Sequence, residues 1–184
     1  MIEDYSFFRL KLDSEIKSFS CEDYPDLKQF LFDDAKNHLN ELLAVTYVFE
    51  NKKETIAYFS VLNDSIREKD TSKSHYKKIL GLIPYALRKR YKSHPSVKVG
   101  RLAVSEKYRS TGIGTEIMDY IKGYFLDNNK TGCRFIVVDA LNNNRTISYY
   151  KKNGFDFLTT EDKDDESRLM FFDLIKYAFH SEYK

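Results

Sequence analysis

Apolar and polar positions alternate along the first forty residues in two different rhythms. Tyr5 to Leu12 alternates at every second position after an aromatic start, a pattern that predicts a strand. Asp23 to Leu39 instead carries its apolar residues three and four positions apart, which predicts a helix. We expect Asp23 to be the N-cap of this helix and Pro25 to lie in its first turn.

Two β-branched and aromatic runs follow, Leu42 to Glu50 and Thr55 to Leu62, with a four-residue polar loop between them. This arrangement predicts a β-hairpin. Residues 63–96 have the least regular pattern, and we expect them to form an insertion of irregular shape. The insertion contains one helical stretch, Tyr76 to Tyr91, which Pro84 perturbs.

The second half of the chain has a sharper pattern. It predicts a strand, a helix and a strand in turn: Val97 to Val104, Gly112 to Asp127 and Phe135 to Ala140. Further elements are a short helix that Gly154 ends and two strands: Asn143 to Asn153, Phe155 to Leu158 and Leu169 to Leu174. We therefore predict one α+β domain over residues 1–184, a mixed sheet with antiparallel flanks and helices on both faces.

Composition narrows the class of protein. The 184 residues suit one domain, and 42% hydrophobic with 32% charged residues excludes a disordered or low-complexity chain. The longest apolar run, Leu42 to Phe49, is far shorter than the ~20 residues of a membrane helix. Acidic residues at the start argue against a secretory signal, so we expect a cytoplasmic protein in which Cys21 and Cys133 are reduced.

The net charge of +2 conceals an uneven distribution. From Arg67 to Arg101 the chain has 11 Lys or Arg and only two acids, a local balance of +9. One interpretation is a solvated, lysine-rich surface. The other is a surface that binds a polyanion, such as a nucleic acid or a nucleotide cofactor.

The segment Arg109-Ser110-Thr111-Gly112-Ile113-Gly114 lies where the predicted strand passes into the predicted helix. Its two glycines let the backbone approach a ligand closely and direct several N–H groups to one point. The helix that starts here adds the positive end of its dipole, so the segment is suited to a phosphate or pyrophosphate. A tight glycine-rich turn is the alternative, because the pattern is short. No Walker or dinucleotide-binding motif is present, and no metal site is predicted.

A larger set of residues resembles the acetyl-CoA-binding core of the GNAT superfamily of N-acetyltransferases. The matching segments are Gly100-Arg101-Leu102-Ala103-Val104, Tyr108 to Gly114, Asn143 and Tyr149-Tyr150-Lys151-Lys152-Asn153-Gly154-Phe155. The resemblance covers Val97 to Leu158. It implies a splayed sheet whose central strands part to admit the pantetheine arm of acetyl-CoA.

The same resemblance implies roles for individual residues. Leu102, Ala103 and Val104 would line the pantetheine arm, with the backbone of Leu102 and Val104 bonded to it. The amides of Arg109, Ser110, Thr111, Gly112, Ile113 and Gly114 would bind the pyrophosphate, and Asn143 would make a polar contact to the cofactor. Tyr150 occupies the position of a tyrosine beside the thioester sulfur, so we expect it to be the general acid; we expect Tyr149 to be a core residue. A phenol with a pKa of about 10 is protonated at neutral pH and can donate to the leaving thiolate.

The predicted strand Val97 to Val104 lacks the carboxylate that relatives acting on lysine-like amines often carry there. An α-amine, with a pKa of about 7.7 to 8.0, is partly neutral without a base, whereas a lysine amine at about 10.4 is not. Removal of the proton by water, or by a base from another segment such as His94 or Asp139, is the alternative, although we expect His94 to be a surface-loop histidine.

The first half also resembles, less specifically, a GNAT branch of toxins that acetylate aminoacyl-tRNA. The resemblance rests on Phe19-Ser20-Cys21, Asp26-Leu27, Phe30-Leu31, Ala35 and Leu42 to Val48. It implies an antitoxin as partner, and a homodimer is compatible with it. A small amine, a protein amine and aminoacyl-tRNA stay open as acceptors. An acyl-CoA-binding regulatory module without turnover is the hypothesis from another class, and an RNA-binding protein without catalysis is a further one.

Overall fold

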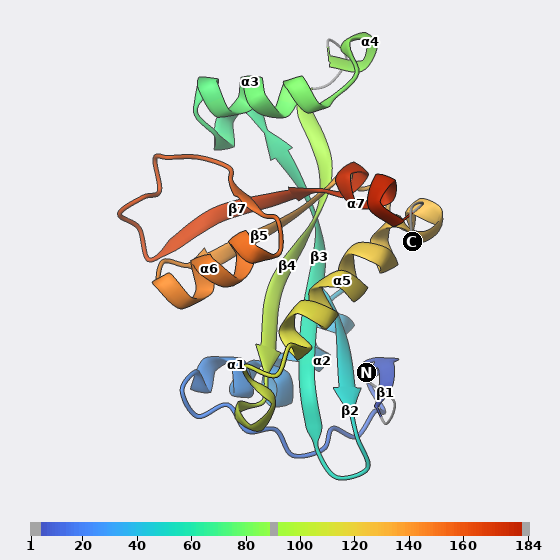
Figure 1. Cartoon of the computed structure of the whole chain (residues 1–184). Helices are drawn as coiled ribbons and strands as arrows, with labels where there is room; N and C mark the ends of the chain where they lie inside the picture. Colours follow the sequence, from blue (N-terminus) through green and yellow to red (C-terminus); the bar gives the residue numbers. More distant parts are fainter. Residues whose placement is uncertain (1–4, 89–91, 182–184) are drawn as a thin grey trace. The chain divides into compact units, whose positions relative to one another are not determined.

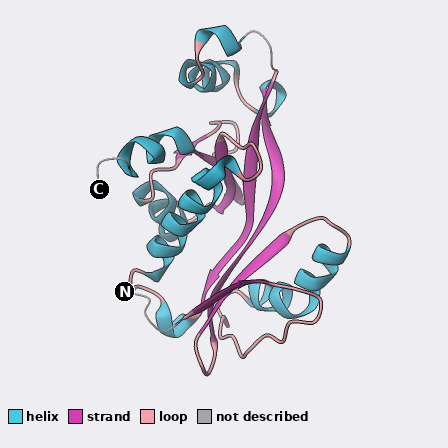
Figure 2. Cartoon of the chain, turned by 90° about the vertical axis from the view of Figure 1, so that its right-hand side faces the viewer, coloured by secondary structure: helices cyan, strands magenta, loops and turns pink. Residues whose placement is uncertain are grey.

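Seven strands form one mixed sheet in the computed structural model of the chain, which describes residues 5–88 and 92–181. The strands are β1 Ser6–Arg9, β2 Val45–Glu50, β3 Thr55–Arg67, β4 Ser93–Val104, β5 Phe135–Leu141, β6 Asp156–Phe157 and β7 Ser167–Asp173 (Figure 1). Their order across the sheet is β1-β2-β3-β4-β5-β7-β6. Helices connect these strands along the chain (Figure 2). The predicted mixed α+β fold is confirmed.

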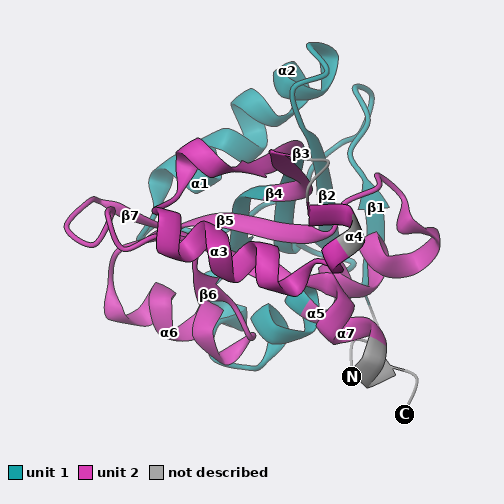
Figure 3. Ribbon diagram, turned by 90° about the horizontal axis from the view of Figure 1, so that it is seen from above, with its two compact units in different colours: residues 1–62, 99–118 teal, residues 63–98, 119–184 magenta. Residues whose placement is uncertain are grey.

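The α-helices are α1 Pro25–Gln29, α2 Ala35–Asn40, α3 Lys73–Leu82, α4 Tyr85–Arg88, α5 Ile113–Leu126, α6 Asn144–Lys152 and α7 Leu174–Ser181. Within the described residues, no helix has the length and apolar character that crossing a lipid bilayer requires. The chain divides into two compact units (Figure 3): residues 1–62 with 99–118, and residues 63–98 with 119–184. We call them unit 1 and unit 2; β3, β4 and α5 contribute residues to both.

The sheet of unit 1 is built on the predicted hairpin. β2 and β3 pair antiparallel, with Val48 opposite Tyr58, and the side chain of Asn51 closes the loop by accepting the N–H groups of Lys53 and Glu54 at 2.8 and 2.9 Å. β1 pairs antiparallel with β2 and is shorter than the predicted strand. The hairpin prediction is confirmed.

The helical segment of unit 1 differs in detail from the prediction. Pro25 lies in its first turn as predicted, but a π-helical turn, Phe30–Asp34, interrupts the helix between α1 and α2. The prediction of Asp23 as N-cap is wrong, because Tyr24 holds that position without a side-chain cap. The helices pack on the hairpin through a buried cluster that includes Leu31, Ala35, Val48, Tyr58 and Ala103.

In unit 2, β5 pairs antiparallel with β7 over seven residues, and β6 adds a short edge strand. Phe135, Val137 and Phe171 lie on one face of this sheet, where Ile79 of α3 packs against them. At the end of α6, Gly154 has φ +82°, and a Cβ there would lie 3.1 Å from the Phe172 ring, so glycine suits this position. The predicted strand–helix–strand order and the helix ending at Gly154 are confirmed.

Residues 63–96 are more regular than their composition predicts. β3 continues to Arg67, α3 and α4 follow, and β4 already begins at Ser93. Pro84 separates α3 from α4, so the expected helical stretch is divided there; its last residues, 89–91, lie outside the described residues. Several of the cations are used locally: Arg67 pairs with Asp70, and Arg88 donates to the carbonyls of Gly81 and Ile83.

His94 is not the surface-loop residue that the sequence predicts. It lies within β4 with 3% of its surface exposed, and its ring stacks on Tyr76 and meets Phe135 edge-on. Its Nε2 atom is buried and has no hydrogen-bond partner among the described residues. Burial, and then the positive charge of Arg134, lower the pKa of His94 because both disfavour the imidazolium.

This environment predicts an acid-sensitive fold. Because the folded pKa is depressed, the unfolded chain binds the proton more readily, so stability is lost as the pH falls below the ordinary histidine value of about 6.5. We expect the urea midpoint of the wild type to fall more between pH 7.5 and 5.5 than that of His94→Phe, which cannot be protonated. His75→Gln is the matched control and should behave as the wild type; equal pH dependence in all three proteins would contradict the assignment.

Candidate active site

The segment between β4 and α5 presents unpaired backbone donors. Ser110 and Gly112 have positive φ angles of 63° and 96°, which turn the chain before α5 begins at Ile113. The N–H groups of Ser110, Thr111 and Gly112 donate to no acceptor within the described residues. Such donors at the start of a 14-residue helix form an anion-binding concavity. The assignment of this segment to a pyrophosphate stays a prediction, and only the N–H groups from Ser110 onward have this geometry.

The backbone N–H and the side chain of Arg109 are both engaged in contacts within the protein. Its N–H donates to the carbonyl of Glu106, and its Nε donates to the carbonyl of Val104 at 3.0 Å. The guanidinium also contacts the carboxylate of Asp23 at 2.6 Å and the sulfur of Cys21 at 3.2 Å. The Arg109 side chain therefore connects the segment to residues 21–23. A bound anion would accept hydrogen bonds from the N–H groups of the residues after Arg109.

Glu106 also connects this segment to residues 20–23. Its carboxylate accepts the N–H groups of Glu22 and Asp23 and the hydroxyl of Ser20. The hydrogen bond from the backbone N–H of Glu22 is the main reason why the pKa of Glu106 is lowered. Together, Glu106 and Arg109 form what we call the loop clamp.

The loop clamp predicts a specific effect of Arg109→Lys. Lysine keeps the charge but has a single donor group, so it cannot hold Val104, Asp23 and Cys21 at once. We expect the KM for the acetyl donor to rise severalfold with kcat little changed, because the N–H groups would be displaced and no reacting group is lost. Lys107→Arg, on the neighbouring exposed residue, is the control; a fall in kcat alone for Arg109→Lys would contradict a positioning role.

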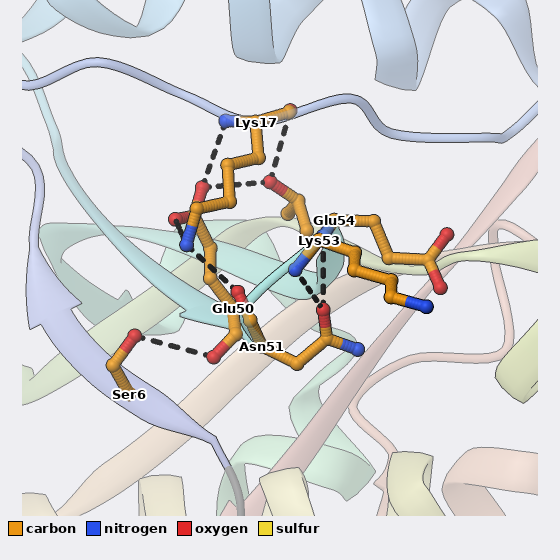
Figure 4. A network of polar contacts seen from close by, with 7 residues as sticks. Ser6, Lys17, Glu50, Asn51, Lys53 and Glu54 are labelled. Atoms are coloured by element: carbon orange, nitrogen blue, oxygen red, sulfur yellow. Dashed lines mark hydrogen bonds and ion pairs between the residues drawn. The ribbon is translucent and has the colours of Figure 1, made fainter.

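The carboxylates of the β2–β3 hairpin are occupied by structural contacts. Glu50 is buried and holds Lys17 and the hydroxyl of Thr55 (Figure 4). Glu54 accepts hydrogen bonds from Lys107 and Tyr108, and these bonds, that of Lys107 first, lower its pKa. Neither carboxylate is arranged as a general base.

Residues 102–104 belong to the unit 1 part of β4, which neighbours β3 in the sheet. The N–H of Ser105 donates to Ile56 of β3, so by strand alternation the backbone groups of Leu102 and Val104 point away from β3. The Val104 carbonyl takes the Arg109 Nε on that side. Ala103, between them, is packed in the core. The contact of the Leu102 and Val104 backbone with a pantetheine arm stays a prediction.

In unit 2, Tyr150 lies on α6 with 8% of its surface exposed. Its ring meets those of Tyr149 and Phe155 at 5.1 and 5.3 Å between centroids, and its hydroxyl bonds to no described residue. Burial, with a smaller effect of the Asp139 charge, raises the pKa of Tyr150. The phenol is therefore protonated at neutral pH and has its proton available for a ligand.

The side chains of the neighbouring residues Asn142 and Asn143 make different hydrogen bonds. The Asn143 side chain accepts the N–H of Thr146 at 2.9 Å and caps α6. The Asn142 side chain donates to the carbonyls of Lys163 and Asp165, which anchors the acidic loop. Asn143 is exposed, so a cofactor contact from its amide nitrogen is compatible with its capping role.

The two alternative bases are in settings that do not favour proton abstraction. His94 is buried between aromatic rings, as described above. Asp139 forms an ion pair with Lys98 of β4. Among the described residues, no group of three or more His, Cys, Asp or Glu side chains is placed to hold a metal ion.

Comparison with known proteins identifies one matching family profile and several solved structures with a similar fold. The profile described as "Acetyltransferase (GNAT) domain" matches residues 44–156. No curated protein sequence matches the chain.

Three solved structures illustrate the similarity in fold. AtaT complexed with acetyl-methionyl-tRNAfMet has a TM-score of 0.73 at 20% identity, covering 96% of this chain and 98% of that one. AtaTR bound with AcCoA has a TM-score of 0.73 at 22% identity, with 96% and 98% covered. A tyrosine-to-phenylalanine variant of the AtaT toxin, bound to the C-terminus of the antitoxin AtaR, has a TM-score of 0.71 at 19% identity, with 95% and 94% covered.

Proposed function

Because the chain belongs to the GNAT family of acetyltransferases, we propose that it transfers the acetyl group of acetyl-CoA to the α-amine of an aminoacyl-tRNA. The observation that carries this proposal is the similarity to AtaT in complex with acetyl-methionyl-tRNAfMet, which extends over 96% of the chain. It includes segments outside the matched family domain, before residue 44 and after residue 156.

The residues of unit 1 fit acetyl-CoA. The N–H groups of Ser110, Thr111 and Gly112 have no acceptor in the part of the chain that the structure describes, as a diphosphate site requires. Ile113 and Gly114 continue the site into the first turn of α5, and Leu102 and Val104 offer backbone groups for the pantetheine amides. We assign to Asn143 of unit 2 a further polar contact with acetyl-CoA.

Acetyl-CoA supplies a thioester, whose carbonyl carbon is the point of attack for the acceptor nitrogen. As the C–S bond breaks, its electron pair stays on sulfur, and the Tyr150 hydroxyl donates the proton that neutralises it. The acceptor nitrogen gives its surplus proton to water. Tyr150 regains a proton from solvent, so the enzyme is unchanged after each turnover.

The acceptor class follows from the missing base. Residues 97–104 of β4 contain no carboxylate, and Asp139 is paired with Lys98. An α-amine needs no dedicated base because its pKa of about 7.7 to 8.0 leaves part of it neutral at pH 7. A lysine side chain, at about 10.4, would be almost fully protonated. This difference favours an aminoacyl ester over a protein lysine.

Two of the structural neighbours are assemblies with another macromolecule: the AtaT variant toxin with the C-terminus of the antitoxin AtaR, and the KacTA–DNA complex. By this analogy we propose that a protein antitoxin binds this chain and controls its activity. The homodimer stays a prediction from the sequence.

A thiol-release assay with acetyl-CoA tests the proposal. The acceptors are methionyl-tRNA, free methionine, a peptide with a free α-amine and a small polyamine. We expect release with methionyl-tRNA at a kcat/KM far above that of the others. Preferential release with the polyamine or the peptide would refute the acceptor assignment, and no release above background with any acceptor would support a non-catalytic acyl-CoA-binding module instead.

A further inference from the structure

A cavity of about 350 Å³ lies in unit 2, between α3 and the edge strand β6. One wall is a stripe of α3, formed by His75, Lys78, Ile79 and Leu82. Lys78 and Ile79 are each three or four residues from His75 and from Leu82, the spacing of a single helix face. The volume lies within the range of about 300 to 1,000 Å³ that is usual for sites of small ligands.

The floor of the cavity is apolar. Ile79, Leu158 and Phe171 line it and belong to the buried cluster that joins α3 to β5 and β7. α3 and β5 belong to the same unit (Figure 3), and Ile79 of α3 shares one buried cluster with Phe135 and Val137 of β5. A flat, uncharged group could therefore rest on a rigid surface there.

The rim of the cavity is cationic. Lys78 of α3, Lys151 of α6 and Asp156 of β6 are among the residues that line it. Asp156 pairs with Lys151 at 3.1 Å, whereas the exposed Lys78 forms no ion pair with a described residue. The Lys78 ammonium group therefore places positive charge beside the apolar floor.

The positive charge continues along α3 beyond the cavity. Lys73 and Lys77 are exposed, lie one turn apart and pair with no acid among the described residues. Other cations of the basic stretch are engaged, among them Arg67, Arg88 and Lys98. Within the described residues, α3 therefore carries three lysines of this stretch that pair with no acid: Lys73, Lys77 and Lys78.

We infer that this cavity binds one nucleotide of an RNA strand, with the phosphate at Lys78 and the base on the apolar floor. The inference rests on the proposed function for the presence of RNA. A nucleotide combines the two properties that the cavity matches, an anionic phosphate and a flat ring, and unpaired RNA exposes both. Lys73 and Lys77 would contact the neighbouring phosphates.

Salt-dependent binding of unacylated tRNA tests this site without relying on turnover. In Lys78→Ala we expect the Kd to rise about three- to tenfold, and the slope of log Kd against log salt to fall by about 0.7 to 0.9, the value for one lost phosphate contact. Alanine preserves the helix, and Lys52→Ala, on the exposed loop of the β2–β3 hairpin, is the matched control with unchanged slope. Acetyl-CoA binding should be the same in all three proteins.

Two results would overturn the inference. The first is a Kd and slope for Lys78→Ala equal to those of Lys52→Ala. The second is saturable binding of AMP that Lys78→Ala abolishes while tRNA binding is unaffected, which would identify a free nucleotide as the ligand. If wild-type protein binds tRNA through Lys78 but transfers no acetyl group to methionyl-tRNA, the proposed function fails and the nucleotide site stands.

Discussion

Replacing Tyr150 by phenylalanine should lower kcat by about 10² to 10⁴, the range for loss of a general acid. The ring contacts with Tyr149 and Phe155 do not need the hydroxyl, so the fold should be preserved. Binding of acetyl-CoA should change little, because the diphosphate is assigned to residues 110–114. Single-turnover acetyl transfer, with the Kd for acetyl-CoA measured separately, distinguishes these two effects.

Tyr149→Phe is the control on the same helix, and we expect it to retain most of the activity. A pH profile adds a second readout. Because burial raises the pKa of Tyr150 above its ordinary value of about 10, its proton is retained on the alkaline side. The wild-type rate should therefore rise as the acceptor amine loses its proton and show no falling limb below about pH 10. Unchanged kcat in Tyr150→Phe would remove Tyr150 from the chemistry.

Replacing Gly112 by aspartate should weaken acetyl-CoA binding by about tenfold to a hundredfold. A Cβ at this position meets no atom within 4 Å, so the new side chain finds space, but its carboxylate would lie beside the N–H groups that receive the diphosphate. Each charge-assisted hydrogen bond lost is worth about 1.5 to 3 kcal/mol, which converts to that range of affinity. Equilibrium titration with acetyl-CoA gives the Kd directly.

Gly112→Asn separates charge from backbone strain. Asparagine has nearly the same shape as aspartate and tolerates the φ of +96° better than most residues, without adding charge. We expect a much smaller loss of affinity for Gly112→Asn than for Gly112→Asp. Equal affinities of Gly112→Asp and wild type would show that the diphosphate lies elsewhere.

Local patterns in the sequence predict most of the fold. The hairpin follows from two β-branched runs around a polar loop, and α5 follows from apolar residues four apart. Pro84 divides α3 from α4, as proline chemistry requires. The turn between β4 and α5 is also predictable, because glycine spacing at a strand–helix junction is itself a local signal; its role in binding the cofactor stays a prediction.

Contacts between distant segments are not predictable in this way. The loop clamp joins Asp23 to Glu106 and Arg109, residues more than eighty positions apart, and Asp23 instead has the local pattern of a helix cap. His94, between Ser93 and Pro95, has the composition of a loop, yet pairing with neighbouring strands extends β4 through it. In both cases tertiary contacts override the local preference.

The most direct test of the account is to locate the acetyl group after reaction. Wild-type protein is incubated with isotopically labelled acetyl-CoA and methionyl-tRNA, the RNA is digested with nuclease, and the fragments are analysed by mass spectrometry. The account predicts the label on the α-amine of the methionyl ester at the 3′-terminal adenosine, at a yield that Tyr150→Phe lowers strongly. Label on the tRNA bases, on protein lysines alone or on no fragment would contradict it.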